Sequence, residues 1–194
     1  MKIIGLRNGD GRELPQQVFL IADSTIIRNN KPFFVPHFAQ RFTARVALAL
    51  HIDRLGKHIE PRFAHRYCGA IAPAIKVDAQ GINIPQLSEQ HSALVHSFDG
   101  ALMLGDFTTI DNCDDINSTT VSAFCNNNAV ASGSIAAMGL DYREVISQLS
   151  TFFTLKMGDI ILIELSSVEF DINIGDTLTV TSVDNLSKLT IRVK

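Results

Sequence analysis

The chain has 194 residues, a length typical of one domain, and we expect a single domain over residues 1–194. Hydrophobic residues make up 46% of the chain and charged residues 19%, so a sizeable core is available and a disordered chain is excluded. The formal net charge is −3 and no basic run is longer than two residues, which argues against nucleic acid and against an anionic membrane as partners.

The N-terminal residues lack the apolar region and cleavage site of a secretory signal peptide, and no apolar run is long enough to cross a bilayer. The three cysteines, Cys68, Cys113 and Cys125, have neither metal-ligand nor redox-motif spacing. We therefore expect reduced thiols and, by elimination, a cytoplasmic protein.

The first expected elements are two β-branched runs, residues 2–6 and 18–27, which predict strands separated by a turn at Asn8-Gly9-Asp10-Gly11. A third strand is expected at residues 45–52, where the side chains alternate between two faces. Bulky apolar residues occupy one face, and the other face carries Arg45, Ala47, Ala49 and His51. We expect the first face to pack in the core and the second to line a cavity.

Helices are expected at only two places, residues 60–67 and 141–153. In the second, Asp141 is a suitable N-cap, Glu144 follows three residues later, and an apolar stripe continues along the helix. Between the two helices, residues 111–134 are rich in Asn, Ser, Thr and Asp, and we expect them to be the least ordered part of the chain.

Strands resume after the second helix, at residues 159–165, 177–183 and 188–193, two of them introduced by Gly-Asp turns. Residues 160–163 are uniformly apolar, which predicts a strand buried on both faces. The pattern as a whole predicts a mainly β domain with few helices.

The chain carries no phosphate-binding glycine loop, no zinc-ligand pattern and no nucleophile elbow. Its six histidines are scattered, and a lone histidine is usually a surface or core residue. Asp111, Asp114 and Asp115 lack the alternating spacing and the closing glutamate of a calcium loop, so we expect a solvated loop there. The residues by themselves assign no function.

Six segments in order resemble the fumarylacetoacetate hydrolase family, and a closing Gly175-Asp176 turn extends the match along the whole chain. The segments are Phe19–Ser24, Asn30–Pro36, Arg54–Ile59, Phe63–Tyr67, Ser97–Gly100 and Phe153–Asp159. The resemblance implies a mixed β-roll or sandwich and, usually, a homodimer, and the apolar run at residues 160–163 also favours a homodimer. Members of the family hold Mg²⁺ or Mn²⁺ with a Glu-x-Glu pair and an Asp, and the metal polarises an oxo acid for C–C bond hydrolysis, decarboxylation or tautomerisation.

The metal-ligand positions of the family are degenerate here. The resemblance puts Arg45 and Ala47 at the Glu-x-Glu pair and Lys76 at the Asp. Three carboxylates are thereby replaced by two cations and an alanine. Two like charges about 5 Å apart repel each other by about 3 kcal/mol at an effective dielectric near 20, so a metal ion at this place would be repelled by both cations. The resemblance therefore implies that neither Mg²⁺ nor Mn²⁺ binds here and that the chain has no cofactor.

Other positions that the family uses near its substrate also differ. In this chain, Ile21 and His96 lie where the family has lysines, and Glu164 lies where the family has a glycine of the active-site loop. The Arg-Asn-Tyr start of the family is reduced to Arg7 and a following Asn-Gly. We expect Ile21, Asp99 and Glu164 to surround the former pocket.

Three interpretations stay open. The favoured one is a non-catalytic pseudoenzyme that binds a small anion, such as an oxo acid, or a related subunit. The second is an oxo-acid enzyme without metal, with Lys76 and His96 as candidate catalytic residues; Arg45 would lower the pKa of Lys76 and favour a Schiff base. The third, compatible with the first, is that Arg45 and Lys76 pair internally with Glu164 or Asp99.

Overall fold

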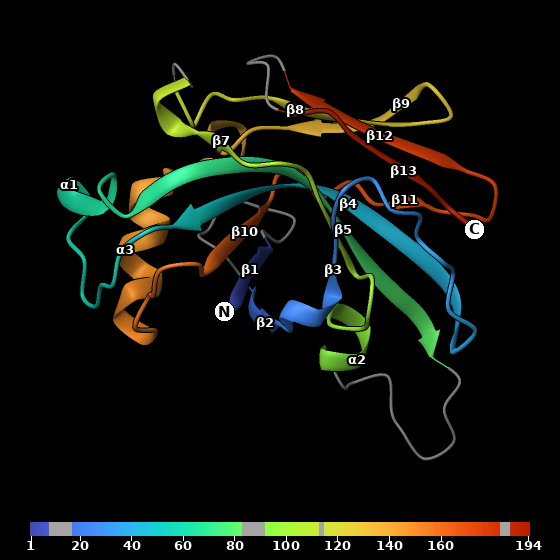
Figure 1. Cartoon of the computed structure of the whole chain (residues 1–194), viewed down its shortest axis with the longest axis horizontal. Coiled ribbons are helices and arrows are strands. Elements are labelled where there is room, and N and C mark those ends of the chain that lie inside the picture. The colour runs from blue at the N-terminus through green and yellow to red at the C-terminus, as the bar shows by residue number, and fades with distance from the viewer. Residues whose placement is uncertain (8–16, 83–91, 113–114, 183–186) are drawn as a thin grey trace.

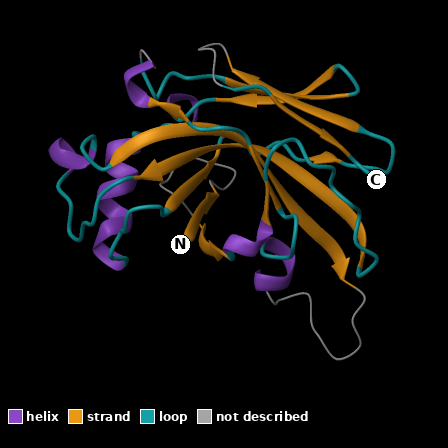
Figure 2. Ribbon diagram, viewed as in Figure 1, coloured by secondary structure: helices purple, strands orange, loops and turns teal. Residues whose placement is uncertain are grey.

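The computed structural model describes residues 1–7, 17–82, 92–112, 115–182 and 187–194. Strands in two sheets are the main secondary structure of these residues, with three short α-helices, so the expected mainly β fold is confirmed (Figure 2). No helix in these ranges is both long and apolar enough to cross a membrane.

The larger sheet curls on itself. Its strand order is β2-β1-β10-β4-β5-β6-β3. Outside this path, β11 pairs with β4 and β7 pairs with β5. Because β2 and β3 lie at opposite ends of this order but are joined only by residues 22–25, the sheet has to bend round until its two ends meet. The strands are β1 Ile3–Arg7, β2 Gln17–Ile21, β3 Ile26–Ile27, β4 Ala39–Ile52, β5 Cys68–Ile82, β6 Leu102–Leu104, β7 Thr108–Thr109, β10 Ile160–Glu164 and β11 Phe170–Asp171.

The smaller sheet, in the order β13-β12-β8-β9, lies across the convex side of the long strands β4 and β5 (Figure 1). The helices α1 and α3 lie together at one end of the molecule, and α2 lies on the concave side. These elements are β8 Val121–Cys125, β9 Asn128–Gly133, β12 Thr177–Ser182, β13 Leu189–Arg192, α1 Pro61–Ala64, α2 Ser92–His96 and α3 Tyr142–Phe152.

Two separate apolar cores follow from the alternation of side chains along β4 and β5. The larger core fills the space between the two sheets and under α3, and it includes Val46, Leu48, Leu50 and Ile52. The smaller core fills the inside of the curled sheet, where every strand of the main path contributes a residue. Its floor is made of small side chains, Ala47, Ala49, Ala72 and Ala74, because the curvature brings the opposite strands close.

Several predicted elements are confirmed. The predicted core face of residues 45–52 is confirmed, and residues 160–163 are fully buried between β1 and β4. Helix α3 begins after Asp141, whose carboxylate accepts a hydrogen bond from the Arg143 backbone N–H at 2.8 Å. Cys68 and Cys125 are thiols, whereas Cys113, Asp114 and the turn predicted at residues 8–11 lie outside the described residues.

Other predictions are wrong. The single strand predicted at residues 18–27 is interrupted after Ile21 by a 3-10 turn at Asp23–Thr25, in which the Thr25 hydroxyl donates to the Ala22 carbonyl at 2.6 Å. Residues 121–133, predicted to be poorly ordered, form the hairpin of β8 and β9. Part of the polar composition of this segment belongs to the hairpin turn, where Asn126 and Asn127 both have positive φ.

The first predicted helix is shorter than expected, since α1 spans only Pro61–Ala64. Helix α2 and the long strand β5 were not predicted. Residues 68–79 of β5 are buried or half-buried throughout, so the alternation that marks a strand with one solvent-facing side is missing.

Candidate functional site

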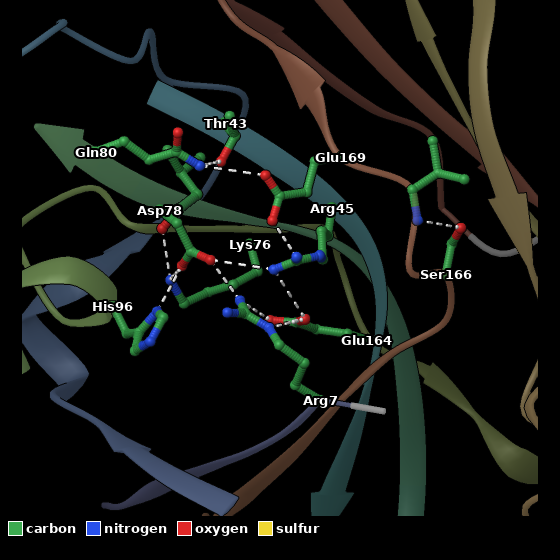
Figure 3. A network of polar contacts seen from close by, with 12 residues as sticks. Arg7, Thr43, Arg45, Lys76, Asp78, Gln80, His96, Glu164, Ser166 and Glu169 are labelled. Carbon is green, nitrogen blue, oxygen red and sulfur yellow. Dashed lines mark hydrogen bonds and ion pairs between the residues drawn. The ribbon is translucent and has the colours of Figure 1, made fainter. Parts of the chain in front are cut away.

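A cluster of charged side chains lies at one end of the smaller core, where the inward-facing positions of four neighbouring strands change from apolar to charged (Figure 3). Arg7 ends β1, Glu164 ends β10, Arg45 lies on β4, and Lys76 and Asp78 lie on β5. We call these five residues, together with His96 and Glu169, the charged cluster.

Strand pairing brings the members together. Arg45 lies directly opposite Lys76 in the β4–β5 pair, and Glu164 lies opposite Ala47 in the β10–β4 pair. Because successive side chains of a strand point to opposite faces, Lys76 and Asp78 share the face on which Arg45 and Ala47 lie. The pairing therefore concentrates the charges on the concave side of the sheet.

Glu164 is held mainly by Arg7. The guanidinium of Arg7 forms a bidentate contact, in which Nε donates to Oε2 at 2.6 Å and Nη2 donates to Oε1 at 2.8 Å. Arg45 contributes a second cation, with Nη1 3.6 Å from Oε2 of Glu164. The Glu164 carboxylate, only 1% exposed, therefore has two guanidinium partners.

Asp78 is the centre of the charged cluster. Its Oδ1 lies 2.9 Å from Nζ of Lys76 and 2.7 Å from Nδ1 of His96, and its Oδ2 contacts Arg7 and also Arg45, the latter at 3.3 Å. Burial acts to raise the pKa of Asp78, but the hydrogen bond with His96 and the charges of Lys76 and Arg7 outweigh burial and hold this pKa well below its usual range. Asp78 is therefore ionised at neutral pH.

Lys76 is the most deeply buried cation, with a side chain that is 0% exposed. Burial lowers its pKa, opposed by the charge and hydrogen bond of Asp78. Its ammonium also donates to the backbone carbonyl of Val77. For Arg7, burial alone would lower the pKa, but hydrogen bonding and charge from Glu164 and Asp78 raise it.

Arg45 reaches from the cluster toward solvent. Its Nη2 contacts the carboxylate of Glu169, which also accepts a hydrogen bond from the side-chain amide of Gln80 at 3.2 Å. Its Nε is buried and has no partner within the described part of the chain. Arg45 therefore links the buried carboxylates to a partly exposed one.

Phe19 forms the aromatic wall of the cluster. Its ring lies 5.5 Å from the Arg7 guanidinium and 4.9 Å from the His96 ring. Gly5 lies opposite Phe19 in the β1–β2 pair, and a Cβ at Gly5 would overlap this ring. The missing side chain at Gly5 therefore allows Phe19 to fold across β1 and to contact both the Arg7 guanidinium and the His96 ring.

The formal charges of the cluster cancel. Leaving His96 out of the count, Arg7, Arg45 and Lys76 carry three positive charges, and Asp78, Glu164 and Glu169 carry three negative charges. Each carboxylate contacts at least one cation, and within the described ranges no three His, Cys, Asp or Glu side chains are arranged to hold a metal ion. The arrangement is thus suited to internal ion pairing rather than to binding a cation.

The residues singled out from the sequence divide into two groups. Arg45, Lys76, His96 and Glu164 converge in the cluster (Figure 3). Ala47 and Ile21 belong to the neighbouring apolar core.

Asp99 follows α2 in an exposed turn and forms no ion pair with Arg45 or Lys76 in the described part of the chain. The expected contact of Glu164 with Arg45 is present, but the expectation that Glu164 or Asp99 would pair with Lys76 is wrong, because Asp78 on the same strand lies nearer.

Arg7, Asp78 and Glu169 were not recognised from the sequence as partners of these residues. One signal was available: Lys76 and Asp78 are two residues apart, a spacing that places them on one face of a strand. Nothing in the sequence connects Arg7 with Glu164, which is 157 residues away.

Comparison with known proteins gives a family and a fold. Residues 7–194 match the family described as fumarylacetoacetate (FAA) hydrolase, C-terminal. A comparison with curated protein sequences gives no significant match.

Similar solved structures include a Burkholderia cenocepacia protein with proposed fumarylpyruvate hydrolase activity, with TM-score 0.88 and 16% identity over 100% of this chain and 84% of that one. The fumarylpyruvate hydrolase of Pseudomonas aeruginosa, in complex with Mn²⁺ and pyruvate, has TM-score 0.81 and 15% identity over 99% and 88% of the two chains. The 5-carboxymethyl-2-hydroxymuconate delta-isomerase of Mycobacterium smegmatis has TM-score 0.84 and 22% identity over 99% and 78%. At these identities the likeness shows the fold.

Proposed function

The chain belongs to the fumarylacetoacetate hydrolase family, and we propose that it is a non-catalytic member in which internal ion pairs take the place of the divalent metal. The observation that carries this proposal is the closed charge balance of the cluster. Arg45 and Lys76, at two of the positions where the resemblance expects metal ligands, are both paired with Asp78. The third position, Ala47, is fully buried and offers no ligand atom.

The residues present do not fit Mg²⁺ or Mn²⁺. Both ions prefer several oxygen ligands, mostly carboxylates and water. The carboxylates nearest the expected position, Asp78 and Glu164, are turned toward guanidinium and ammonium groups, so a divalent cation would have to displace cations that cannot leave.

Internal pairing also weighs against a tightly bound oxo acid in the cluster. A carboxylate ligand would compete with Asp78 and Glu164 for the same guanidinium N–H groups, and the protein carboxylates are already held in place. Among the interpretations drawn from the sequence, internal pairing together with loss of catalysis is therefore favoured over binding of a small anion.

The test combines metal binding with turnover. We expect the spectrum of free Mn²⁺, measured by electron paramagnetic resonance, to keep its full intensity when the protein is added. We also expect no hydrolysis of fumarylpyruvate above the buffer rate with either Mn²⁺ or Mg²⁺. The Pseudomonas aeruginosa fumarylpyruvate hydrolase is the positive control in both assays. Stoichiometric loss of the free Mn²⁺ signal, or metal-dependent turnover, would overturn the proposal.

Chemistry through Lys76 is the second candidate. The lowered pKa of this lysine favours it, since a neutral amine is the nucleophile in Schiff-base formation. Its complete burial and its contact with Asp78 weigh against it, because a substrate carbonyl has no open approach to Nζ. Incubation with pyruvate and borohydride, followed by mass spectrometry, is expected to leave Lys76 unmodified, and a reduced adduct on Lys76 would favour this candidate instead.

We also propose that the protein is cytoplasmic, by elimination from the sequence, and that it forms a homodimer, as the family resemblance implies. The apolar strand β10 lies inside the protomer between β1 and β4, so it does not provide the dimer surface. Support for the dimer therefore comes from the family resemblance alone.

A further inference from the structure

Two surface segments are paired at the end of the molecule where α1 and α3 lie (Figure 1). Residues 54–58 contact the last turn of α3 and the residues that follow it, and Gly56 forms an antiparallel bridge with Leu155. The backbone N–H of Gly56 donates to the Leu155 carbonyl at 2.9 Å, and the return bond measures 2.8 Å. The His58 N–H donates to the Ser150 carbonyl at 3.0 Å. Backbone hydrogen bonds and the buried side chain of Leu155 therefore hold this surface in a defined shape.

Three large apolar side chains project from these segments into solvent. Leu55 is 69% exposed, Phe152 77% and Met157 76%. The Gly56–Leu155 bridge brings the two segments that carry these side chains next to each other. Single exposed apolar residues are common, but these three lie on two segments joined by backbone hydrogen bonds, and exposed apolar residues that lie near one another are typical of surfaces that bind a partner.

The same surface is basic although the whole chain has a net charge of −3. Arg54, Lys57 and Lys156 are exposed, and residues 54–58 and 152–157 contain no acidic residue. Lys57 is ordered by a hydrogen bond from its Nζ to the Phe152 carbonyl at 3.1 Å.

Two of the neighbouring acidic groups are paired with other cations, and a third, the half-buried Asp53, directly precedes Arg54 in the chain. Glu60 pairs with Arg62 at 2.8 Å, and Asp159 is buried and pairs with Lys2. We define the basic apolar patch as Arg54, Leu55, Lys57, Phe152, Lys156 and Met157.

We propose that the basic apolar patch docks an acidic, amphipathic segment of a different protein. Charge complementarity indicates this occupant: three exposed cations and three exposed apolar side chains lie on the same two segments, so the matching surface carries both carboxylates and apolar side chains. This goes beyond the proposed loss of catalysis and does not depend on it, since the patch and the charged cluster share no residue.

Two other occupants fit the patch less well. In a twofold dimer formed through this patch, the three cations of one copy would lie near the same three cations of the other copy and repel them. An anionic membrane is typically recognised by clusters of about four to eight Lys or Arg residues, more than the patch contains.

The probe for this proposal is a 16-residue helical peptide with glutamates on one face and leucine and phenylalanine on the other. Binding to the full chain is measured by fluorescence anisotropy at two salt concentrations. Three probes serve as comparisons: the same peptide with lysine for glutamate, the same peptide with serine for the apolar residues, and vesicles containing phosphatidylserine.

We expect saturable binding of the acidic amphipathic peptide alone, weakened by added salt. The Lys57→Glu/Lys156→Glu variant is expected to bind about tenfold more weakly, and Phe152→Ser is expected to weaken binding by a similar factor. The matched control is Ile174→Ser, which removes another apolar side chain, 71% exposed, from a turn outside the patch. This control is expected to bind like the unaltered protein.

Three results would overturn the proposal. The first is no binding of the acidic peptide, or binding that the patch variants leave unchanged. The second is binding to the phosphatidylserine vesicles that Lys57→Glu/Lys156→Glu abolishes, which would assign the patch to a membrane. The third is a fall in the solution mass of the protein on Phe152→Ser but not on Ile174→Ser, which would assign it to a second copy of the chain.

Discussion

Replacing Glu164 by glutamine tests whether the charged cluster is an integral part of the fold. Glu164 accepts two charged hydrogen bonds from Arg7 and lies 3.6 Å from Arg45, and it is almost completely buried. A glutamine keeps the shape but has one acceptor oxygen, and its NH₂ group would face a guanidinium that can only donate. The change leaves three cations against two carboxylates.

The expected loss of unfolding free energy follows from these contacts. A hydrogen bond to a charged group contributes roughly 1.5–3 kcal/mol, and removing one partner of a buried ion pair costs roughly 3–5 kcal/mol. Because Asp78 continues to neutralise Arg7 and Arg45 in part, we expect Glu164→Gln to lose about 2–4 kcal/mol at pH 7.

Urea unfolding followed by circular dichroism measures this loss. The matched control is Asp171→Asn, which breaks the Arg41–Asp171 pair, whose side chains are 57% and 51% exposed. Exposed pairs of this kind contribute about 0–1 kcal/mol, so the control is expected to lose little. A double-mutant cycle with Arg7→Gln should return a coupling of about 0.5–3 kcal/mol. A loss below about 1 kcal/mol for Glu164→Gln, or no coupling with Arg7, would refute the reasoning.

Three further predictions concern metal, pH and assembly. Millimolar Mg²⁺ is expected to leave the melting temperature unchanged, whereas a native-state ligand at a hundred times its Kd would add about 2.7 kcal/mol; a rise that a chelator reverses would contradict this. Because the pKa of Asp78 is held low in the folded state, its contribution to stability is complete above the unfolded value near 3.9 and is lost as the pH falls below it. Asp78→Asn should therefore lower the unfolding free energy at pH 7 and weaken its decrease below about pH 4. An equal decrease below pH 4 in the variant and the unaltered protein, measured by urea unfolding, would contradict this prediction. Light scattering at micromolar protein is expected to give the mass of a dimer, and a monomer mass would count against the family-based assembly.

Part of this fold could be predicted because its causes are local. The alternation along residues 45–52 and the N-cap Asp141 depend on neighbours within a few residues, and both predictions were confirmed. Strand β5 was missed for an equally physical reason: both of its faces are covered, one by the second sheet and one by the curled sheet itself, so no alternating pattern marks it.

The charged cluster could be predicted only in part. The resemblance placed Arg45 and Lys76 at one site, and their direct pairing across β4 and β5 agrees with that placement. Their counter-charges were assigned less well. Asp78, on the same strand face as Lys76, takes the role that was expected of Glu164 or Asp99.

By itself, the sequence determined the class of fold and the faces of its best-patterned elements. The tertiary structure alone decided which charges meet. Arg7 and Glu164 lie far apart in the chain and become neighbours because β1 and β10 pair in parallel and end together. The register of Arg45 against Lys76 then brings Asp78 within reach of both arginines. Ion pairing depends on distances of a few ångströms, and those distances are fixed by strand register rather than by spacing along the chain.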